Sequence, residues 1–410
     1  MRCRSCRSGE MIEVLDLGSQ YLSDFRDDDS RPPKWPLVLT LCGKCGLPQL
    51  RDTTPAELMY HDRYGFRSGV NEAIRDDLRD IVDHALKAHP GALRWLDIGC
   101  NDGTLLSFVP ERVHRVGIDP VAPFAEESRR HADRVVVDFF GPRHFAGDGD
   151  GAGYRTFDVI TSISMFYDLD DPNGFVADVL KVLAADGVWV IQQNYALTML
   201  ELGAVDNVCH EHLTYWSLTA LEDLLGRHGL EVNDVQVTSV NGGCFRTLVS
   251  RRGSRPVSAS VAGHRRREEE HGLRDPAVWR DFAARAARAF GDLRRLVDEI
   301  NAAGQRCYIY GASTRGATIW QGAGLTVKDL PFAVERQAAK VGRRMAAVGV
   351  PIISERQARA DRPEYMLVGP WFFRDVLIER ERGYLEAGGR LIFPLPDLEI
   401  VGAGAATRSP

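Results

Sequence analysis

Short apolar runs, each ending at glycine or a polar residue, recur through the middle of the chain. They lie at residues 93–98, 113–118, 134–137, 157–162 and 187–193. Their length and abrupt ends are typical of buried strands. The stretches around them are predicted to be helical, at 72–88, from 104 onwards, at 123–131 and at 173–183. Strands alternating with helices form a parallel, doubly wound sheet, so we expect a Rossmann-like central domain.

A second set of strand-like runs occupies the C-terminal third, at 307–310, 330–335, 365–369 and 391–393. Before it, residues 265–303 are highly charged and rich in arginine and alanine at helical spacing, which predicts one long linking helix. The N-terminal quarter has few apolar residues and two cysteine pairs. We therefore expect an α/β protein of three parts. These are a small domain with the cysteine pairs at 1–70, a central Rossmann-like domain with a doubly wound sheet at 71–255, and a second Rossmann-like α/β domain at 256–410.

Composition narrows the class of protein. At 410 residues and 44% hydrophobic content the chain can bury more than one core. A net charge of −6 argues against nucleic acid or an anionic membrane as a partner. No apolar run approaches membrane-spanning length, and the N-terminus lacks a hydrophobic signal core. Eight cysteines, four of them in C-x-x-C pairs, favour a reducing compartment. A cytoplasmic, soluble enzyme is expected.

The two C-x-x-C pairs predict a metal site. Cys3 and Cys6 form the first pair, and Cys42 and Cys45 form the second. Two residues between cysteines let both thiolates face one tetrahedral ion, and four thiolates leave no position open for water. We therefore expect a structural zinc ion, with the residues between the pairs forming a loop or hairpin. Free thiols are the alternative.

The turn after the first central strand is the strongest ligand signal. Gly99 and Gly103 let the backbone pass close to a ligand, and Asp119 ends the next strand, where a carboxylate can accept hydrogen bonds from both ribose hydroxyls of an adenosine. The G-x-G-x-x-G of dinucleotide enzymes and the lysine of a P-loop are absent, which favours S-adenosylmethionine. An ordinary strand-turn-helix is the alternative. The residues predicted to bind the donor are Asp97, Gly99, Asn101, Asp102, Asp119, Asp138, Phe139 and Ser162.

Two features of this set have competing explanations. Asp138 follows the third strand and can accept from the adenine amine, or it can cap a helix. Residues 162–169 follow the fourth strand, so Met165, Phe166 and Tyr167 are expected to face the sulfonium or the acceptor. Packing of these aromatic rings beneath the loop is the alternative.

Residues 206–217 carry the densest chemistry, with His210, Glu211 and His212 in succession. Without H-E-x-x-H spacing a zinc hydrolase site is not indicated, although a second metal site and a structural histidine pair stay open. Histidine titrates near neutral pH, and a neighbouring carboxylate can orient it as a base. A base beside a methyl donor suggests a carbon nucleophile, because a carbon nucleophile must first lose a proton, and only a C–H next to a carbonyl is acidic enough to do so.

The acceptor is expected to lie between the domains. An aromatic, glycine-rich segment at 64–71 supplies one side, and the C-terminal turn at 311–316 can bind phosphates through its helix amides. A plain linker and a capped helix without ligand are the alternatives. The residues predicted to bind the acceptor are Tyr64, Phe66, Ser68, Asn71, Asn194, Gly311, Ser313, Thr314, Arg315 and Trp371.

Motifs along nearly the whole chain resemble the nucleotide-sugar C-methyltransferase family. They are the cysteine pairs, YGFRSGVN, DIGCNDGTLL, FYDLDDP, CHEHLTYWS, NGGCFR, GASTRG, VGPWFFRD and GGRLIFPLP. The resemblance implies a zinc-binding N-terminal domain, a central S-adenosylmethionine domain and a C-terminal domain that helps to hold a nucleotide sugar. It also implies methylation of the carbon beside a 4-keto group, usually carbon 3. The family's catalytic base falls on His212, with Glu211 beside it and His210 in the same loop.

The chain departs from this family at several positions. In the sugar 3-C-methyltransferase branch a tyrosine stands at the position of Cys209 and a histidine at that of Tyr167. Residues 335–338 and 346–348 replace family segments that border the nucleotide. We expect a monomeric or homodimeric C-methyltransferase of deoxysugar biosynthesis, with a small-molecule nucleotide sugar as its partner. The alternatives are another acceptor, either a non-sugar or an oxygen nucleophile, and a non-catalytic protein that binds a sugar nucleotide.

Overall fold

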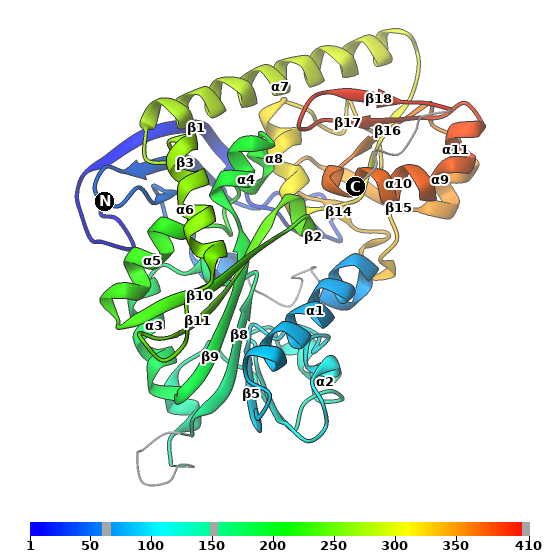
Figure 1. Ribbon diagram of the computed structural model, residues 1–410. Helices are drawn as coiled ribbons and strands as arrows, with labels where there is room; N and C mark the ends of the chain where they lie inside the picture. Colours follow the sequence, from blue (N-terminus) through cyan, green and yellow to red (C-terminus); the bar gives the residue numbers. More distant parts are fainter. Residues whose placement is uncertain (60–66, 148–154, 404–410) are drawn as a thin grey trace.

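Three sheets organise the computed structural model, which describes residues 1–59, 67–147 and 155–403 (Figure 1). The central sheet has seven strands in the order β10-β11-β9-β8-β5-β6-β7. Its parallel strands are β5 (Arg94–Ile98), β6 (His114–Ile118), β7 (Arg134–Val136), β8 (Phe157–Ile163) and β9 (Leu183–Asn194). The antiparallel strands β10 (Leu230–Thr238) and β11 (Cys244–Arg251) extend one edge. The apolar runs therefore predicted the parallel strands and the Rossmann-like class correctly.

The helices around this sheet fit the prediction in part. Helix α1 (Glu72–Ala88) forms where expected, and it buries Ile74, Leu78 and Ile81. Helices α3 (Pro172–Val182), α4 (Ala196–Glu201) and α5 (Leu218–Arg227) follow. The stretch expected to be helical at 123–131 is the 3₁₀ turn η4 (Ala122–Phe124) and the short α2 (Ala125–Ser128).

The helix expected from residue 104 does not form, which corrects that prediction. The chain makes turns and the short 3₁₀ helix η3 (Leu106–Phe108) instead. Pro110 follows closely, and a proline disfavours helical geometry in the residue before it, so too few residues remain for an α-helix. The side chain of Asp102 also caps the amide of Thr104 locally, at 3.2 Å.

The C-terminal sheet has eight strands in the order β18-β17-β16-β12-β13-β15-β14-β2. Its strands are β12 (Cys307–Tyr310), β13 (Ala333–Glu335), β14 (Arg344–Met345), β15 (Val350–Ser354), β16 (Tyr365–Val368), β17 (Arg390–Phe393) and β18 (Glu399–Val401). The helices of this part are α8 (Thr314–Gly322), α9 (Glu355–Asp361), α10 (Arg374–Arg380) and α11 (Arg382–Glu386). A second α/β unit is confirmed, and its last strand comes from far away in the chain, since β2 (Phe25–Arg26) pairs with β14.

The long linking helix is in fact two helices, α6 (Ala259–His271) and α7 (Pro276–Ala302). Gly272 ends α6 with a φ of +67°, and Pro276 begins α7, with Asp275 accepting from the amide of Ala277. A glycine in the left-handed conformation commonly ends a helix, and a proline after a capping residue commonly begins one, so the two together indicate a boundary between helices. The regular spacing of alanine and arginine on both sides concealed this boundary in the sequence.

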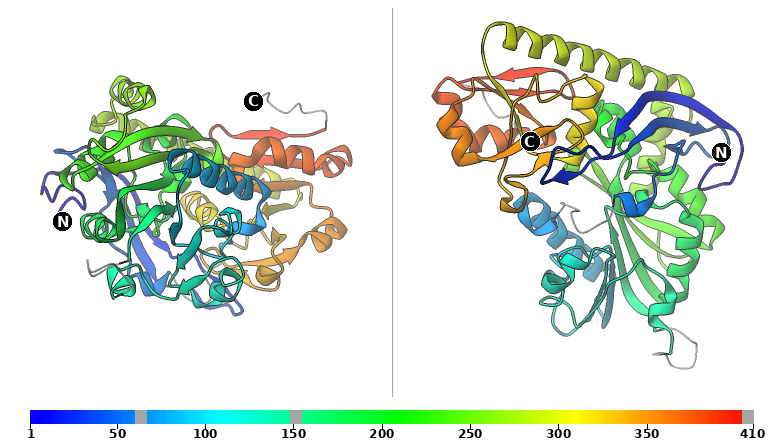
Figure 2. Two further views of the ribbon diagram at one scale, coloured as in Figure 1. Left: turned by 60° about the horizontal axis from the view of Figure 1, so that its bottom comes forward. Right: turned by 180° about the vertical axis from the view of Figure 1, so that it is seen from behind.

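The N-terminal residues form a three-stranded sheet of β1 (Met11–Tyr21), β3 (Lys34–Cys42) and β4 (Pro48–Leu50). The residues between the cysteine pairs thus form an antiparallel hairpin, as expected. From behind, these strands extend from the central sheet towards α7 and the C-terminal sheet (Figure 2). Within the described ranges, no helix is long and apolar enough to cross a membrane.

Candidate active site

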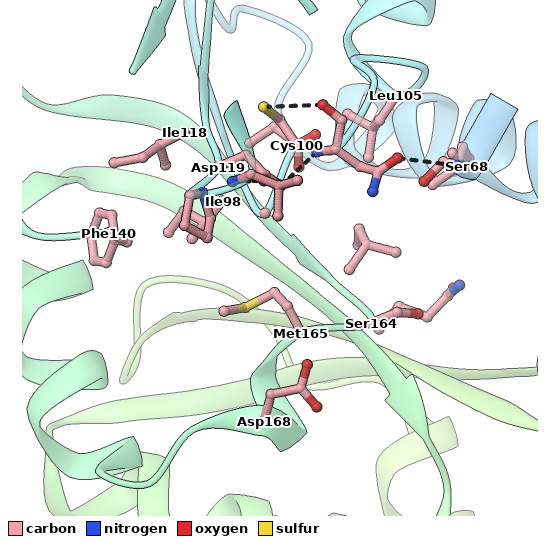
Figure 3. A pocket seen from close by; sticks show the side chains of 18 of the residues that line it. Ser68, Ile98, Cys100, Leu105, Ile118, Asp119, Phe140, Ser164, Met165 and Asp168 are labelled. Atoms are coloured by element: carbon pink, nitrogen blue, oxygen red, sulfur yellow. Dashed lines mark hydrogen bonds between the residues drawn. The ribbon is translucent and has the colours of Figure 1, made fainter. Parts of the chain in front are cut away.

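A pocket of about 280 Å³ opens at the carboxyl ends of β5, β6 and β8 (Figure 3). Its wall includes Gly99, Asp119 and Met165. Gly99 has a φ of +76°, and a Cβ there would lie 3.1 Å from the Met165 side chain. At Gly103, whose φ is +79°, a Cβ would lie 2.8 Å from the Cα of Ser128. The two glycines therefore serve different ends, since Gly99 keeps the pocket open and Gly103 lets two backbones meet.

Asp119 is held in one orientation at the tip of β6. Its Oδ2 accepts from the amide of Asn101 and its Oδ1 from the amide of Val121, both at 2.9 Å. Burial raises the pKa of this carboxyl group. Asn101 has a left-handed φ of +49°, and its Oδ1 accepts from the amide of Ser68 at 3.1 Å. Asp102 accepts from the amide of Gly69 at 2.9 Å. The glycine turn is thereby tied to η2 (Ser68–Val70), which borders the pocket.

Asp97 ends β5 inside the same pocket and is fully enclosed. Its Oδ1 accepts from the hydroxyl of Thr161 at 2.7 Å. Burial, opposed by that hydrogen bond, raises the pKa of Asp97 to about 7, and the nearby charge of Asp119 adds to the rise. This carboxyl group therefore changes charge near neutral pH.

The remaining predicted donor residues lie in different places. Asp138 and Phe139 line the far end of the pocket, and Phe139 is 53% exposed. A hydrogen bond from Arg143 lowers the pKa of Asp138. Ser162 is buried and accepts from the indole of Trp189 at 3.1 Å. Neither Ser162 nor Asp102 lines the pocket.

Sequence reasoning missed a polar network on the opposite wall. Asp77 of α1 and Gln192 of β9 both line the pocket, and the amide of Gln192 donates to Asp77 at 2.5 Å. The fully buried guanidinium of Arg246 donates to Asp77 at 3.1 Å and to Gln192 at 2.9 Å. The signal for it was Arg246, a charged residue that lies between Phe245 and the apolar pair Leu248 and Val249 of β11.

The charge of the pocket wall is one-sided. Its ionisable residues are all acidic, namely Asp77, Asp97, Asp119, Asp138 and Asp168, and no lysine, arginine or histidine of the described chain joins them. A wall of carboxylates favours a cationic ligand such as a sulfonium.

His212 lies next to this pocket rather than in its wall. Its ring centroid is 4.2 Å from that of Tyr167, whose chain neighbours Met165 and Asp168 line the pocket. The Nδ1 of His212 is 2.9 Å from the carbonyl oxygen of Asn207. A carbonyl only accepts, so Nδ1 carries the proton and Nε2 keeps its lone pair. Burial, aided by the charge of Arg315, lowers the pKa of His212 to about 3. The imidazole is therefore neutral.

The two neighbours of His212 have different environments. His210 points to the N-terminal sheet, with its Nε2 3.1 Å from the carbonyl oxygen of Trp35, and burial lowers its pKa. Burial raises the pKa of Glu211. Within the described ranges, the N-terminal cysteines are the one group arranged to hold a metal ion, so a second metal site at the histidines finds no support.

The C-terminal turn meets the histidine loop through Arg315. Its Nε donates to Asp206 at 2.9 Å and its Nη1 to the carbonyl of Asn241 at 2.6 Å. Its guanidinium also stacks over Phe372. Asp206 belongs to η7 (Val205–Asn207) and Asn241 to η8 (Val240–Gly242), which borders the donor pocket. The side chain predicted to bind phosphate is thus engaged in joining three segments.

Asn194 ends β9 beside this loop, and its amide donates to Asn207 at 2.6 Å. In the C-terminal turn, Gly311 has a φ of +88°, Ser313 caps α8 through Gly316 at 3.0 Å, and Thr314 begins the helix. The indole nitrogen of Trp371 is buried without a partner among the described residues.

The predicted segment at 64–71 divides differently. Tyr64 and Phe66 lie outside the described residues. Ser68 lines the donor pocket, and the side chain of Asn71 caps α1 by accepting from Ala73 at 3.0 Å.

The four N-terminal cysteines come together as predicted. Their sulfur atoms all lie within 4.8 Å of one another, with Cys3 3.6 Å from Cys45 and Cys6 3.5 Å from Cys42. Four thiolates at such separations fit one tetrahedral zinc ion with no open position, which suits a structural rather than a catalytic metal.

Comparison with known proteins identifies this arrangement. Three family models match in succession, described as a zinc binding domain at residues 3–60, a methyltransferase domain at 70–235 and a C-methyltransferase C-terminal domain at 239–396. The C-methyltransferase NovU of Streptomyces niveus is 26% identical over 98% of this chain and 97% of its own length. The chain is an S-adenosylmethionine-dependent C-methyltransferase built from these three domains. This C-methyltransferase uses S-adenosylmethionine and carries zinc.

Solved structures similar to the C-methyltransferase are distant. The plantazolicin methyltransferase BpumL, in complex with a pentazolic analogue and S-adenosylhomocysteine, is 14% identical, with a TM-score of 0.34 over 45% of this chain and 87% of its own. The N-methyltransferase NodS of Bradyrhizobium japonicum WM9 is 16% identical, with a TM-score of 0.33 over 44% of this chain and 98% of its own.

Proposed function

We propose that this C-methyltransferase removes the proton from the carbon next to the ketone of a nucleotide-linked 4-keto-deoxysugar and methylates that carbon, which is carbon 3. The observation that carries the proposal is the neutral imidazole of His212, whose Nδ1 is fixed on the carbonyl of Asn207 and whose ring packs on Tyr167. In this tautomer the lone pair that a general base uses lies on Nε2.

On the donor side, the acidic pocket is the proposed binding site. S-adenosylmethionine supplies an electrophilic methyl group when it is bound. Asp119 is expected to accept from the ribose hydroxyls and Asp138 from the adenine amine, while Asp97 and Asp77 face the cationic part. Gly99 leaves the space that a side chain would fill.

On the acceptor side, Nε2 of His212 takes the C–H proton, and the electron pair of that bond moves into the enolate. We assign the hydroxyl of Tyr167 to hold the enolate oxygen, because its ring lies against His212. The enolate carbon would then form a bond to the methyl carbon of the bound donor while the methyl–sulfur bond breaks and its electron pair stays on sulfur, and the proton on His212 leaves to solvent.

The nucleotide part of the acceptor is proposed to lie at the C-terminal turn. Gly311 opens the turn, Ser313 and Thr314 begin α8, and Trp371 offers a buried indole N–H at the same edge.

The eight cysteines form no disulfide, which agrees with the proposed location in the cytoplasm.

The deciding experiment separates deprotonation from methyl transfer. The protein is incubated in deuterated water, without donor, with a panel of 4-keto-deoxysugar nucleotides, and mass spectrometry follows the acceptor. We expect one deuterium at the carbon next to the ketone, and a gain of one methyl on that carbon once S-adenosylmethionine is added. His212→Asn serves as the control and should show neither. Methylation at oxygen, or no turnover of any keto sugar beside activity on another carbon acid, would reject the sugar assignment.

A further inference from the structure

The chain segments next to the four N-terminal cysteines contact both segments that carry Tyr167 and His212. Strand β4 begins three residues after Cys45 and pairs with the chain just beyond His212. The amide of Leu50 donates to the carbonyl of Leu213, and the amide of Tyr215 donates to the carbonyl of Pro48, both at 2.9 Å. The histidine loop is thus held by an antiparallel bridge to β4, the strand that follows the second cysteine pair.

Arg4 lies between Cys3 and Cys6 and extends from the first cysteine pair into the protein. Its side chain is only 7% exposed. Nη1 donates to the carbonyl of Leu50 at 2.5 Å, and Nη2 to the hydroxyl of Thr53 at 2.8 Å. Nε donates to Asp170 at 3.1 Å. One guanidinium therefore contacts the end of β4 and the segment of Tyr167 together.

The second segment is close to this guanidinium in the chain and in space. Asp170 follows η6 (Phe166–Asp168), which contains Tyr167. The carbonyl of Tyr167 accepts from the amide of Thr214 at 3.0 Å and from its hydroxyl at 3.1 Å. These contacts form a closed ring. It runs from the first cysteine pair through Arg4 to the segment of Tyr167, then to residue 214, and it returns through β4 to the second cysteine pair.

We propose that Arg4 is a positioning residue through which the zinc knuckle sets the geometry between Tyr167 and His212. The donor pocket takes much of its wall from other segments, chiefly the turn at 97–103 and Asp119, and shares Met165 and Asp168 with the segment of Tyr167. Among the described residues, Arg4 has hydrogen bonds to Leu50, Thr53 and Asp170, none of which lines the pocket. In this proposal the zinc knuckle acts mainly on the geometry between Tyr167 and His212 and only weakly on donor binding. Rigid support of this kind is what a base and its partner need to stay within reactive distance.

The test uses the zinc-loaded full-length protein and the variant Arg4→Met. This substitution keeps much of the side-chain volume and removes the guanidinium group that makes the three hydrogen bonds. Arg7→Met is the matched control, because Arg7 directly follows the first cysteine pair, is 54% exposed and forms an ion pair with the exposed Asp171. The measurements are zinc content, affinity for S-adenosylhomocysteine, and amide hydrogen exchange followed by mass spectrometry. The NMR cross-peak of the His212 ring, assigned by its loss in His212→Asn, reports the environment of the base.

For Arg4→Met we expect one zinc per chain and an S-adenosylhomocysteine Kd within threefold of the wild-type value. Exchange should rise at least tenfold in residues 164–171 and 209–216 and stay within twofold in 95–105, and the His212 cross-peak should move. Arg7→Met should match the wild type in every measurement. Unchanged exchange in both segments, an unmoved cross-peak, or an equal rise throughout the chain would overturn the proposal.

A second variant covers the case in which Arg4→Met loses zinc or fails to fold. Asp170→Ala removes the other end of the contact, and this carboxylate is 66% exposed, so the knuckle itself stays intact. It should raise exchange in 164–171 and move the His212 cross-peak with zinc fully bound. If it does neither, Arg4 does not connect the knuckle to the acid–base pair.

Discussion

The rings of Tyr167 and His212 lie 4.2 Å apart and come from loops that follow different strands of the central sheet. This contact places a phenol against a neutral imidazole at the edge of an acidic pocket. We predict that Tyr167→Phe, which keeps the ring and removes the hydroxyl, lowers the rate of acceptor deuteration about a hundredfold, because removal of one oxyanion donor costs about that much.

The measurement is the initial rate of deuterium uptake by the keto acceptor, with S-adenosylhomocysteine affinity as the check on folding. Affinity should stay within about threefold, since the tyrosine packs beside the donor pocket and is not part of its wall. Wild-type deuteration in Tyr167→Phe would show that the enolate is stabilised by another group.

The raised pKa of Asp97 predicts pH-dependent donor binding. In the free protein this carboxyl group is protonated below about pH 7, whereas a cationic donor favours its ionised form. Donor binding must then release a proton at low pH, so affinity rises as pH increases through 7. We expect the Kd for S-adenosylmethionine to be about tenfold higher at pH 6 than at pH 8, which is the change in the ionised fraction.

Isothermal titration calorimetry in two buffers of different ionisation enthalpy measures both the Kd and the released proton. The control is Asp97→Asn, which cannot titrate and should bind with weaker affinity that no longer varies between pH 6 and 8. A pH slope that persists in Asp97→Asn would assign the titration to another carboxylate, such as Asp119, whose pKa burial also raises.

Arg246 is predicted to support both stability and donor binding. Its side chain is fully buried against Asp77, which is 7% exposed, and removal of one partner leaves a buried charge unpaired. Arg246→Met should lower the free energy of unfolding by about 3–5 kcal/mol. It should also weaken S-adenosylmethionine binding, because Asp77 and Gln192 lose the group that orients them in the pocket wall.

Urea denaturation and donor titration check this prediction. The matched control is Arg252→Met, which replaces an exposed arginine that donates to the carbonyl of Gly226 at 3.1 Å, and its effect on stability should stay below about 0.5 kcal/mol. Equal stability of Arg246→Met and Arg252→Met would mean that the buried network contributes nothing net.

The features of this protein that could be predicted from its sequence are those that residue type and spacing within a short segment determine. Strand β5 with Gly99, the tip residue Asp119 and the C-x-x-C pairs each combine residue type with fixed spacing, and the structure brings them together as expected. The parallel strands of the central sheet could be predicted from apolar runs because buried parallel strands are apolar on both faces.

What the sequence did not reveal depends on contacts between distant segments. Arg246 and Asp77 are 169 positions apart, and each alone resembles a charged residue on an exposed face. His210 and His212 differ by two positions, yet only the tertiary fold turns one to Trp35 and the other to Tyr167. The strand pairing of β2 with β14 is equally non-local.

Zinc removal is predicted to act on the N-terminal sheet and the histidine loop together. The apolar side chains of the first sheet pack into the core of the central sheet, whereas four thiolates hold the open end of its hairpin, so loss of the metal should release that end. Cys42→Ser is expected to lower zinc content below one per chain and to reduce the melting temperature. It should also increase protease cleavage within residues 1–55, while fragments from the C-terminal sheet stay intact at first.

The thermal shift should reverse when zinc is added to chelator-treated wild type and should not reverse in Cys42→Ser. A chelated wild type that melts at the holoprotein temperature would mean that hydrophobic packing of β1 and β3 alone holds this sheet. In that case the metal could not be what steadies the loop of His212.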